Sequence, residues 1–74
     1  MENLIGLKEF MDNLVKEENF HITYASLRQS YKYGTLNENI SKYIIEKKKA
    51  SSVGYYIDKL QQDKFKEALF KQFI

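Results

Sequence analysis

The stretch that most constrains the fold of this chain is residues 64–74, which read Lys64-Phe65-Lys66-Glu67-Ala68-Leu69-Phe70-Lys71-Gln72-Phe73-Ile74. On a helical period of 3.6 residues, Phe65, Leu69 and Phe73 share one stripe. Phe70 lies about 100° round the helix from Leu69, so the same neighbour cannot bury both. Phe70 therefore needs a separate cover: another helix of the same domain, a second copy of the chain, or a pocket on another protein.

The length of 74 residues predicts a single domain over residues 1–74, close to the size at which one core barely suffices. With no cysteine and one histidine, neither disulfides nor a typical zinc site is expected to add stability, and no cofactor or metal is implied. We therefore expect a homodimer, formed through a face that includes the C-terminal aromatic residues. The lack of cysteine, of a signal peptide and of a membrane-spanning run indicates a soluble, cytoplasmic protein.

Apolar residues recur along the chain at three- and four-residue steps, which predicts an all-α fold, a compact bundle of four to five short helices. The first helix is expected over residues 3–18 and should end at Asn19, a residue that tolerates the left-handed conformation. Residues 20–24 are expected to form a loop. Their alternation of apolar and polar side chains is also compatible with a strand, and the loop then pairs across a dimer.

The second helix is expected over residues 24–32, with Thr23 as its N-cap and Gly34 as its terminator. A capping box from Thr35 to Glu38 then predicts a third helix that runs to about residue 49. The two helices joined at Gly34 invite comparison with a helix-turn-helix.

The remaining apolar stripe is carried by Val53, Tyr56, Ile57 and Leu60, and it predicts another helix after a break at Ser51 and Ser52. The phase of the stripe slips at residues 61–63. Either this helix bends there, or two short helices meet with Asp63 as the cap of the second.

Enzymatic function is not expected. The sequence contains no Gly-rich phosphate loop and no nucleophile and base at a recognisable spacing, and its acidic residues alternate with lysines as on solvated helix faces. Binding is therefore the class of function to consider.

Charge is distributed unevenly: residues 1–20 carry five acids against two lysines, whereas residues 21–74 carry ten basic residues against five acids. The acidic segment either attracts basic helices of its own domain or meets a basic surface on a partner. Direct nucleic-acid binding is the secondary hypothesis, in which lysines contact phosphates and tyrosines stack on bases. The residues concerned are Arg28, Lys32, Lys42, Lys47, Lys48, Lys49 and Lys59, with Tyr31, Tyr33, Tyr43, Tyr55 and Tyr56.

Residues 66–70, Lys66-Glu67-Ala68-Leu69-Phe70, resemble in their last three positions the short motif by which replication proteins dock on the bacterial DNA-polymerase sliding clamp. Leu69 and Phe70 match that motif, whereas Lys66 and Glu67 depart from its glutamine and leucine. The size and the Lys, Ile, Asn and Tyr usage resemble small host-takeover proteins of phages of Gram-positive bacteria, among them staphylococcal phage inhibitors of the host clamp.

This resemblance implies a non-enzymatic inhibitor that binds the sliding clamp in a host bacterial cell, covering its peptide pocket and entering its basic channel. Leu69 and Phe70 would be the apolar anchors, beside Phe73. The acidic residues of the first helix would steer docking on the basic surface; they are Glu9, Asp12, Glu17 and Glu18.

Overall fold

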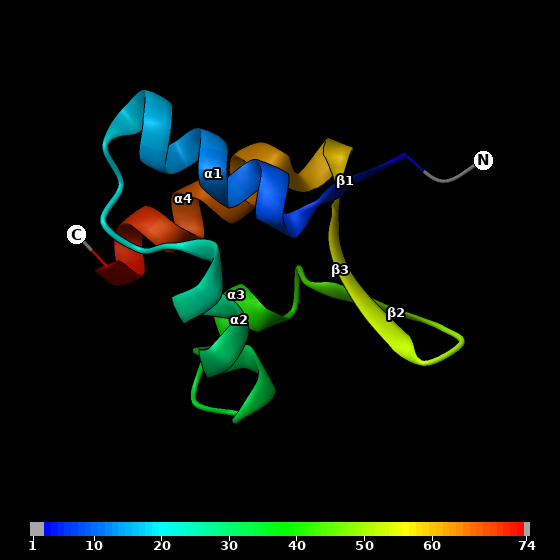
Figure 1. Ribbon diagram of the computed structural model, residues 1–74. Helices are drawn as coiled ribbons and strands as arrows, with labels where there is room; N and C mark the ends of the chain where they lie inside the picture. Colours follow the sequence, from blue (N-terminus) through cyan, green and yellow to red (C-terminus); the bar gives the residue numbers. More distant parts are fainter. Residues whose placement is uncertain (1–2, 74) are drawn as a thin grey trace.

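The computed structural model describes residues 3–73 and has a mixed α/β fold, so the expectation of an all-α bundle is wrong. An antiparallel sheet of three strands, in the order β1-β3-β2, packs beside the helices (Figure 1). The elements in chain order are β1 (Leu4–Gly6), α1 (Leu7–Glu18), α2 (Tyr24–Lys32), α3 (Glu38–Ser41), β2 (Ile45–Lys49), β3 (Ser52–Asp58), the 3-10 helix η1 (Lys59–Gln61) and α4 (Gln62–Phe73).

Strand β1 occupies the first residues of the segment expected to be helical. Leu4 pairs with Asp58 and Gly6 with Tyr56, and the amide of Lys59 donates to the Asn3 carbonyl oxygen at 2.9 Å. The backbone hydrogen-bonding groups of this short segment are thus satisfied by a strand more than fifty residues away, not by the next turn of a helix. Helix α1 begins only at Leu7, and it ends as expected at Asn19, whose φ is 58°.

Strands β2 and β3 form a hairpin where two helical segments were predicted. Its register runs from Ile45 opposite Tyr56 to Lys49 opposite Ser52, so the turn consists of Ala50 and Ser51. The apolar residues of β3 are spaced in a way that fits both a helix and a strand, because a run this short does not distinguish the two periods. Pairing on both sides of β3, together with its β-branched and aromatic residues, decides for the strand.

Helix α2 is confirmed at its predicted bounds, with Thr23 as N-cap. The Ser26 amide donates to Thr23 Oγ1 at 3.3 Å, and Gly34 has the left-handed φ of 73° expected of a terminator. The capping box is wrong: the Thr35 hydroxyl donates back to the Ser30 carbonyl oxygen at 3.3 Å.

Helix α3 is only four residues long, and its N-cap is Asn37, whose Oδ1 accepts from the Asn39 amide at 2.8 Å. The expected long third helix over residues 35–49 is therefore wrong. The break expected at residues 61–63 is present, because η1 ends there and α4 begins. Asp63, expected to cap the second of the two helices, lies inside the first turn of α4 instead, and Asp58 caps η1, accepting from the Leu60 amide at 2.9 Å.

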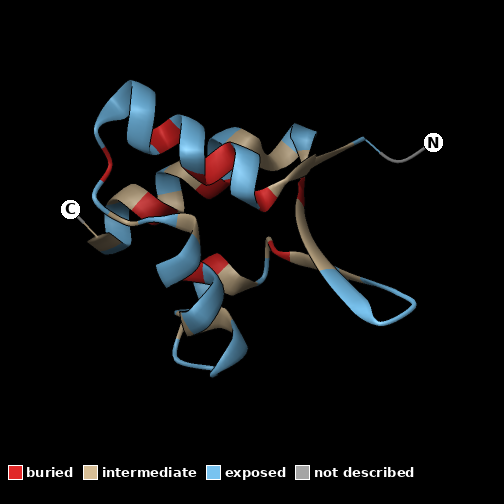
Figure 2. Ribbon diagram, viewed as in Figure 1, coloured by how far each residue is buried: buried red, intermediate tan, exposed pale blue. Residues whose placement is uncertain are grey.

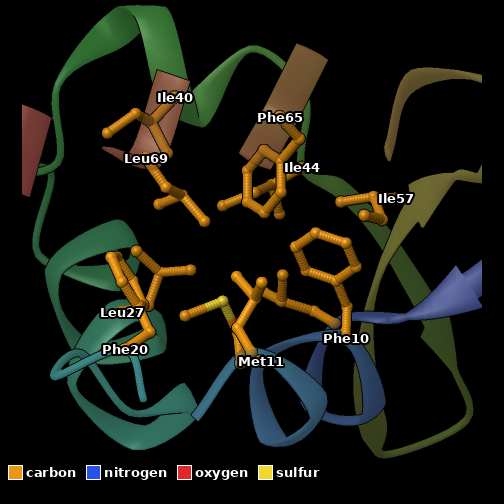
Figure 3. Close-up of a cluster of buried hydrophobic side chains, with 11 residues drawn as sticks. Phe10, Met11, Phe20, Leu27, Ile40, Ile44, Ile57, Phe65 and Leu69 are labelled. Carbon is orange, nitrogen blue, oxygen red and sulfur yellow. The ribbon is translucent and has the colours of Figure 1, made fainter. Parts of the chain in front are cut away.

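A single cluster of buried side chains joins α1, α2, α3, β3 and α4, and Ile5 of β1 packs against it half-buried (Figures 2 and 3). Phe65 of α4 lies at its centre, with its ring centroid 5.4 Å from that of Phe10 in α1 and 5.9 Å from that of Tyr43. The buried apolar residues are Leu7, Phe10, Met11, Leu14, Phe20, Leu27, Ile40, Ile44, Ile57, Phe65 and Leu69. The sheet contributes little to this core apart from Ile57, so the helices supply most of the buried apolar surface.

The hairpin turn places a non-glycine residue in a left-handed conformation, since Ala50 has a φ of 55°. We predict that Ala50→Gly stabilises the protein by about 0.5–1 kcal/mol, because glycine lacks the Cβ that makes this conformation unfavourable. A urea unfolding curve should show a higher midpoint with an unchanged slope. Ser51→Gly is the matched control, since Ser51 lies in the same turn without a positive φ, and it should lower the midpoint or leave it unchanged. A lower midpoint for Ala50→Gly would contradict the prediction.

Candidate nucleic-acid interface

Helix α2 has one face in the core and another in solvent. Leu27 is buried, and Tyr24 and Tyr31 pack against the core cluster from the same side. The opposite side is formed by small, polar and basic residues that are all exposed: Ala25, Ser26, Arg28, Gln29 and Lys32. A helix of nine residues with one apolar face is therefore fixed on the body while its other face is open (Figure 2).

The turn between α1 and α2 is held by both its backbone and its side chains. Asn19 takes the left-handed conformation, and the Phe20 amide donates to the Leu14 carbonyl oxygen at 3.2 Å. Phe20 itself is buried, with its ring 5.2 Å from that of Phe70 in α4. Residues 19–23 join α1 and α2 directly. The comparison of the two helices joined at Gly34 with a helix-turn-helix is wrong, because the segment after Gly34 forms only the short α3 and then a strand.

The hairpin packs against α2 through an aromatic pair. The ring centroids of Tyr31 and Tyr55 are 5.6 Å apart in an edge-to-face arrangement. Between the end of α2 and the hairpin lies a groove of about 430 Å³. It is lined by Tyr31, Lys32, Gly34, Leu36, Ser41, Glu46 and Tyr55. In the view of Figure 1, α2 lies below α1, and the hairpin extends to the lower right with its turn far from α2.

The far end of the hairpin is basic. Lys48 and Lys49 are exposed, and by strand alternation Lys48 and its partner Val53 share the face of Tyr55, which meets α2. The one acid on this face of β2 is Glu46, which lies opposite Tyr55 near the groove. Because the turn contains only Ala50 and Ser51, the lysines stand at the tip of the projecting hairpin.

Ion pairs are formed elsewhere on the molecule. Lys8 donates to Asp12 at 2.7 Å, and this hydrogen bond together with the carboxylate charge raises the pKa of Lys8. Lys71 lies 3.2 Å from Glu67, and Lys66 pairs with Glu18. Among residues 3–73, no hydrogen bond or ion pair engages the side chains of Arg28, Lys32, Lys48 or Lys49, and the same holds for Lys16, Lys59 and Lys64. The sequence from residue 19 to residue 37 contains no acid at all.

The structure separates the acidic residues predicted to meet a partner into two kinds. Glu9 and Glu17 are exposed on α1 without a described partner side chain. Asp12 is bound to Lys8, and Glu18 is bound to Lys66 of α4, so these two also hold the chain together. Exposure of all four agrees with a charged outer face on α1.

The C-terminal aromatic stretch is largely part of the core. Leu69 has no exposed surface, Phe73 is half-buried against the core, and Phe70 is half-buried with its ring against Phe20. Lys66 Nζ lies 5.7 Å from the centre of the Phe70 ring. The separate cover that Phe70 needs is thus supplied within the chain, and of the two proposed anchors only Phe70 reaches the surface.

Most of the tyrosines proposed to stack on bases have structural partners. Tyr43 contacts Phe65 and carries Lys42 Nζ at 5.3 Å from its ring centre, and Tyr55 contacts Tyr31. The Tyr56 ring lies over Gly54, where an added Cβ would come within 2.8 Å of it. Tyr33, directly after α2, is the tyrosine that remains exposed, at 69%.

Comparison with known proteins gives no match to a family model, to a curated protein or to a solved structure, so the functional argument rests on geometry and chemistry. Among residues 3–73, no helix combines the length and the apolar character needed to cross a bilayer.

We predict that Leu69→Ala lowers the free energy of unfolding by about 2–5 kcal/mol, because it leaves a cavity in a closely packed core. Lys71→Ala changes an exposed residue two positions further along α4 and should alter the free energy of unfolding by less than about 0.5 kcal/mol. Chemical denaturation followed by circular dichroism measures both. Equal effects of the two substitutions would show that Leu69 is not a core residue.

Proposed function

We propose that this chain binds duplex DNA through α2 and the β2–β3 hairpin, as a small non-enzymatic DNA-binding protein. The observation that carries the proposal is the set of exposed basic side chains, Arg28, Lys32, Lys48 and Lys49, on two elements that meet through the Tyr31–Tyr55 contact. Surface cations elsewhere on the chain are in part neutralised by carboxylates. Exposed basic groups attract a polyanion, and binding gains free energy from the release of its counterions.

The shape of the surface supports duplex DNA in particular. An α-helix with its side chains is about 10–12 Å across, which matches the roughly 12 Å width of the major groove. Helix α2 is held by the turn after α1 and by Tyr31 on Tyr55, so its exposed face is presented without rearrangement. The hairpin meets this helix through Tyr55, and its lysines would contact phosphates further along the duplex.

A structural role for the hairpin lysines is the main competing explanation. Strand β2 is at the edge of the sheet, and lysines on an edge strand prevent pairing with another chain. That role predicts that loss of the lysines promotes self-association and leaves any DNA binding unchanged. DNA contact predicts that loss of the lysines weakens DNA binding and leaves self-association unchanged.

The test is fluorescence anisotropy with a labelled duplex at several salt concentrations. The unmodified chain should lose affinity steeply with salt, and Lys48→Gln with Lys49→Gln should reduce the slope of log K against log salt by about 2. A matched control, Lys16→Gln with Lys64→Gln, removes the same charge from exposed positions on α1 and α4 and should leave most of the slope intact. Absence of binding at low salt, or an equal fall in slope for both double variants, would overturn the proposal.

Binding to a bacterial sliding clamp remains a second candidate, which rests on a different part of the surface. Phe70 lines a shallow groove along α4 of about 420 Å³, bordered by Asp63, Lys66, Glu67 and Lys71. Because Leu69 is buried, a contact there would use Phe70 and Phe73 with the acids of α1, not the adjacent pair of the peptide motif.

Isothermal titration calorimetry with purified clamp tests this candidate. If the contact exists, Phe70→Ala should weaken it by roughly 10-fold or more, since burying a phenylalanine contributes about 1.5–3 kcal/mol. The Lys48→Gln and Lys49→Gln variant should bind the clamp as the unmodified chain does. No heat of binding for the unmodified chain removes the candidate.

A further inference from the structure

The exposed face of α2 carries side chains that match the edges of DNA bases as well as its phosphates. Ala25, Arg28, Gln29 and Lys32 follow one another at steps of three, one and three residues, so they form a continuous stripe on the helix. All four are exposed. The stripe contains no acid, and the small Ala25 at its start allows the backbone to approach a surface closely.

Arg28 and Gln29 have the donor and acceptor groups that distinguish bases in the major groove. An arginine donates two parallel hydrogen bonds to O6 and N7 of guanine, and a glutamine exchanges two with N6 and N7 of adenine. An alanine contacts the methyl group of thymine. A surface required only for phosphates has no use for the glutamine amide or the alanine methyl at these positions.

Neither Arg28 nor Gln29 is engaged by its side chain within residues 3–73, so both are available to a ligand. Their backbone atoms, in contrast, are fixed: the Tyr33 amide donates to the Gln29 carbonyl oxygen at 3.0 Å, and Thr23 caps the start of the helix. Rigid presentation of free polar side chains favours base readout, because a bidentate hydrogen bond requires defined geometry.

We infer that α2 enters the major groove and reads base edges, with Arg28 on a guanine and Gln29 on an adenine, which makes the binding sequence-specific. This inference rests on the proposed binding of duplex DNA. Nine residues of helix span about 13 Å, or roughly four base pairs at 3.4 Å each, so one chain reads a short site. The hairpin lysines contribute affinity and no sequence information.

The experiment is selection from a randomised duplex library with the full-length chain, followed by affinity measurements on the enriched sequence and on single base changes. The enriched sites should share a short motif that includes guanine and adenine. Arg28→Lys keeps the charge and loses the bidentate geometry, so the preference for one guanine should fall roughly 10-fold while the salt slope stays the same. Gln29→Ala should relax the preference at one adenine in the same way.

Lys49→Gln is the matched control at the hairpin: it should weaken all sequences equally and reduce the salt slope by about 1. Arg28, Gln29 and Lys49 are exposed, so thermal unfolding should confirm that each variant stays folded. Binding without any enriched motif, or an unchanged guanine preference in Arg28→Lys, would overturn base readout and leave DNA binding in place. Failure of the chain to bind any duplex at low salt would instead overturn the proposed function itself.

Discussion

The pairing of Leu4–Gly6 with Tyr56–Asp58 is the constraint on which the remaining structure depends. A two-stranded hairpin alone is marginal in water, and the third strand makes β3 a central strand whose Ile57 has no exposed surface. Since α1 begins at the residue directly after β1, this pairing also sets where α1 starts against β3. Helix α1 and the hairpin are thereby oriented by one short segment of sheet.

Helix α4 fixes the turn between α1 and α2. Phe70 packs on Phe20 in the turn, and Lys66 of the same helix pairs with Glu18 at the end of α1. The aromatic contact is the stronger of the two, because an ion pair this exposed contributes at most about 1 kcal/mol. The C-terminal aromatic residues and part of the acidic charge thus make contacts within the chain, whereas the outer face of α2 and the end of the hairpin stay exposed.

The sequence predicts the helical half of this fold well and the sheet poorly, for identifiable reasons. Thr23, Gly34 and Asn19 are local signals whose effect does not depend on distant contacts, and α2 and the end of α1 follow from them. Strand β1 has three residues that continue the helical spacing of α1, and its partner is distant in sequence. The hairpin turn, Ala50 and Ser51, lacks the Asn-Gly or Asp-Gly signature that would have indicated it.

The candidate site was only partly predictable. Its basic residues Arg28, Lys32, Lys48 and Lys49 were recognised from charge, but their grouping depends on a hairpin that was read as helix. The acid-free run over residues 19–37 was the available signal for α2. The burial of Leu69 follows from the same stripe that places Phe65 in the core, and that stripe was visible in the sequence.

Strand β3 is longer than the stretch that either neighbouring strand covers, so its two ends open to solvent with different ease. Tyr56 is paired on both sides, Ile57 and Asp58 pair with β1 alone, and the residues from Ser52 to Tyr55 pair with β2 alone. Local unfolding of the hairpin near its turn exposes little apolar surface, whereas local unfolding near Ile57 disrupts the core. Amide hydrogen exchange should accordingly become slower along β3 from Ser52 to Ile57. The end of the hairpin that carries the lysines of the proposed DNA contact is therefore also the end that changes conformation most readily.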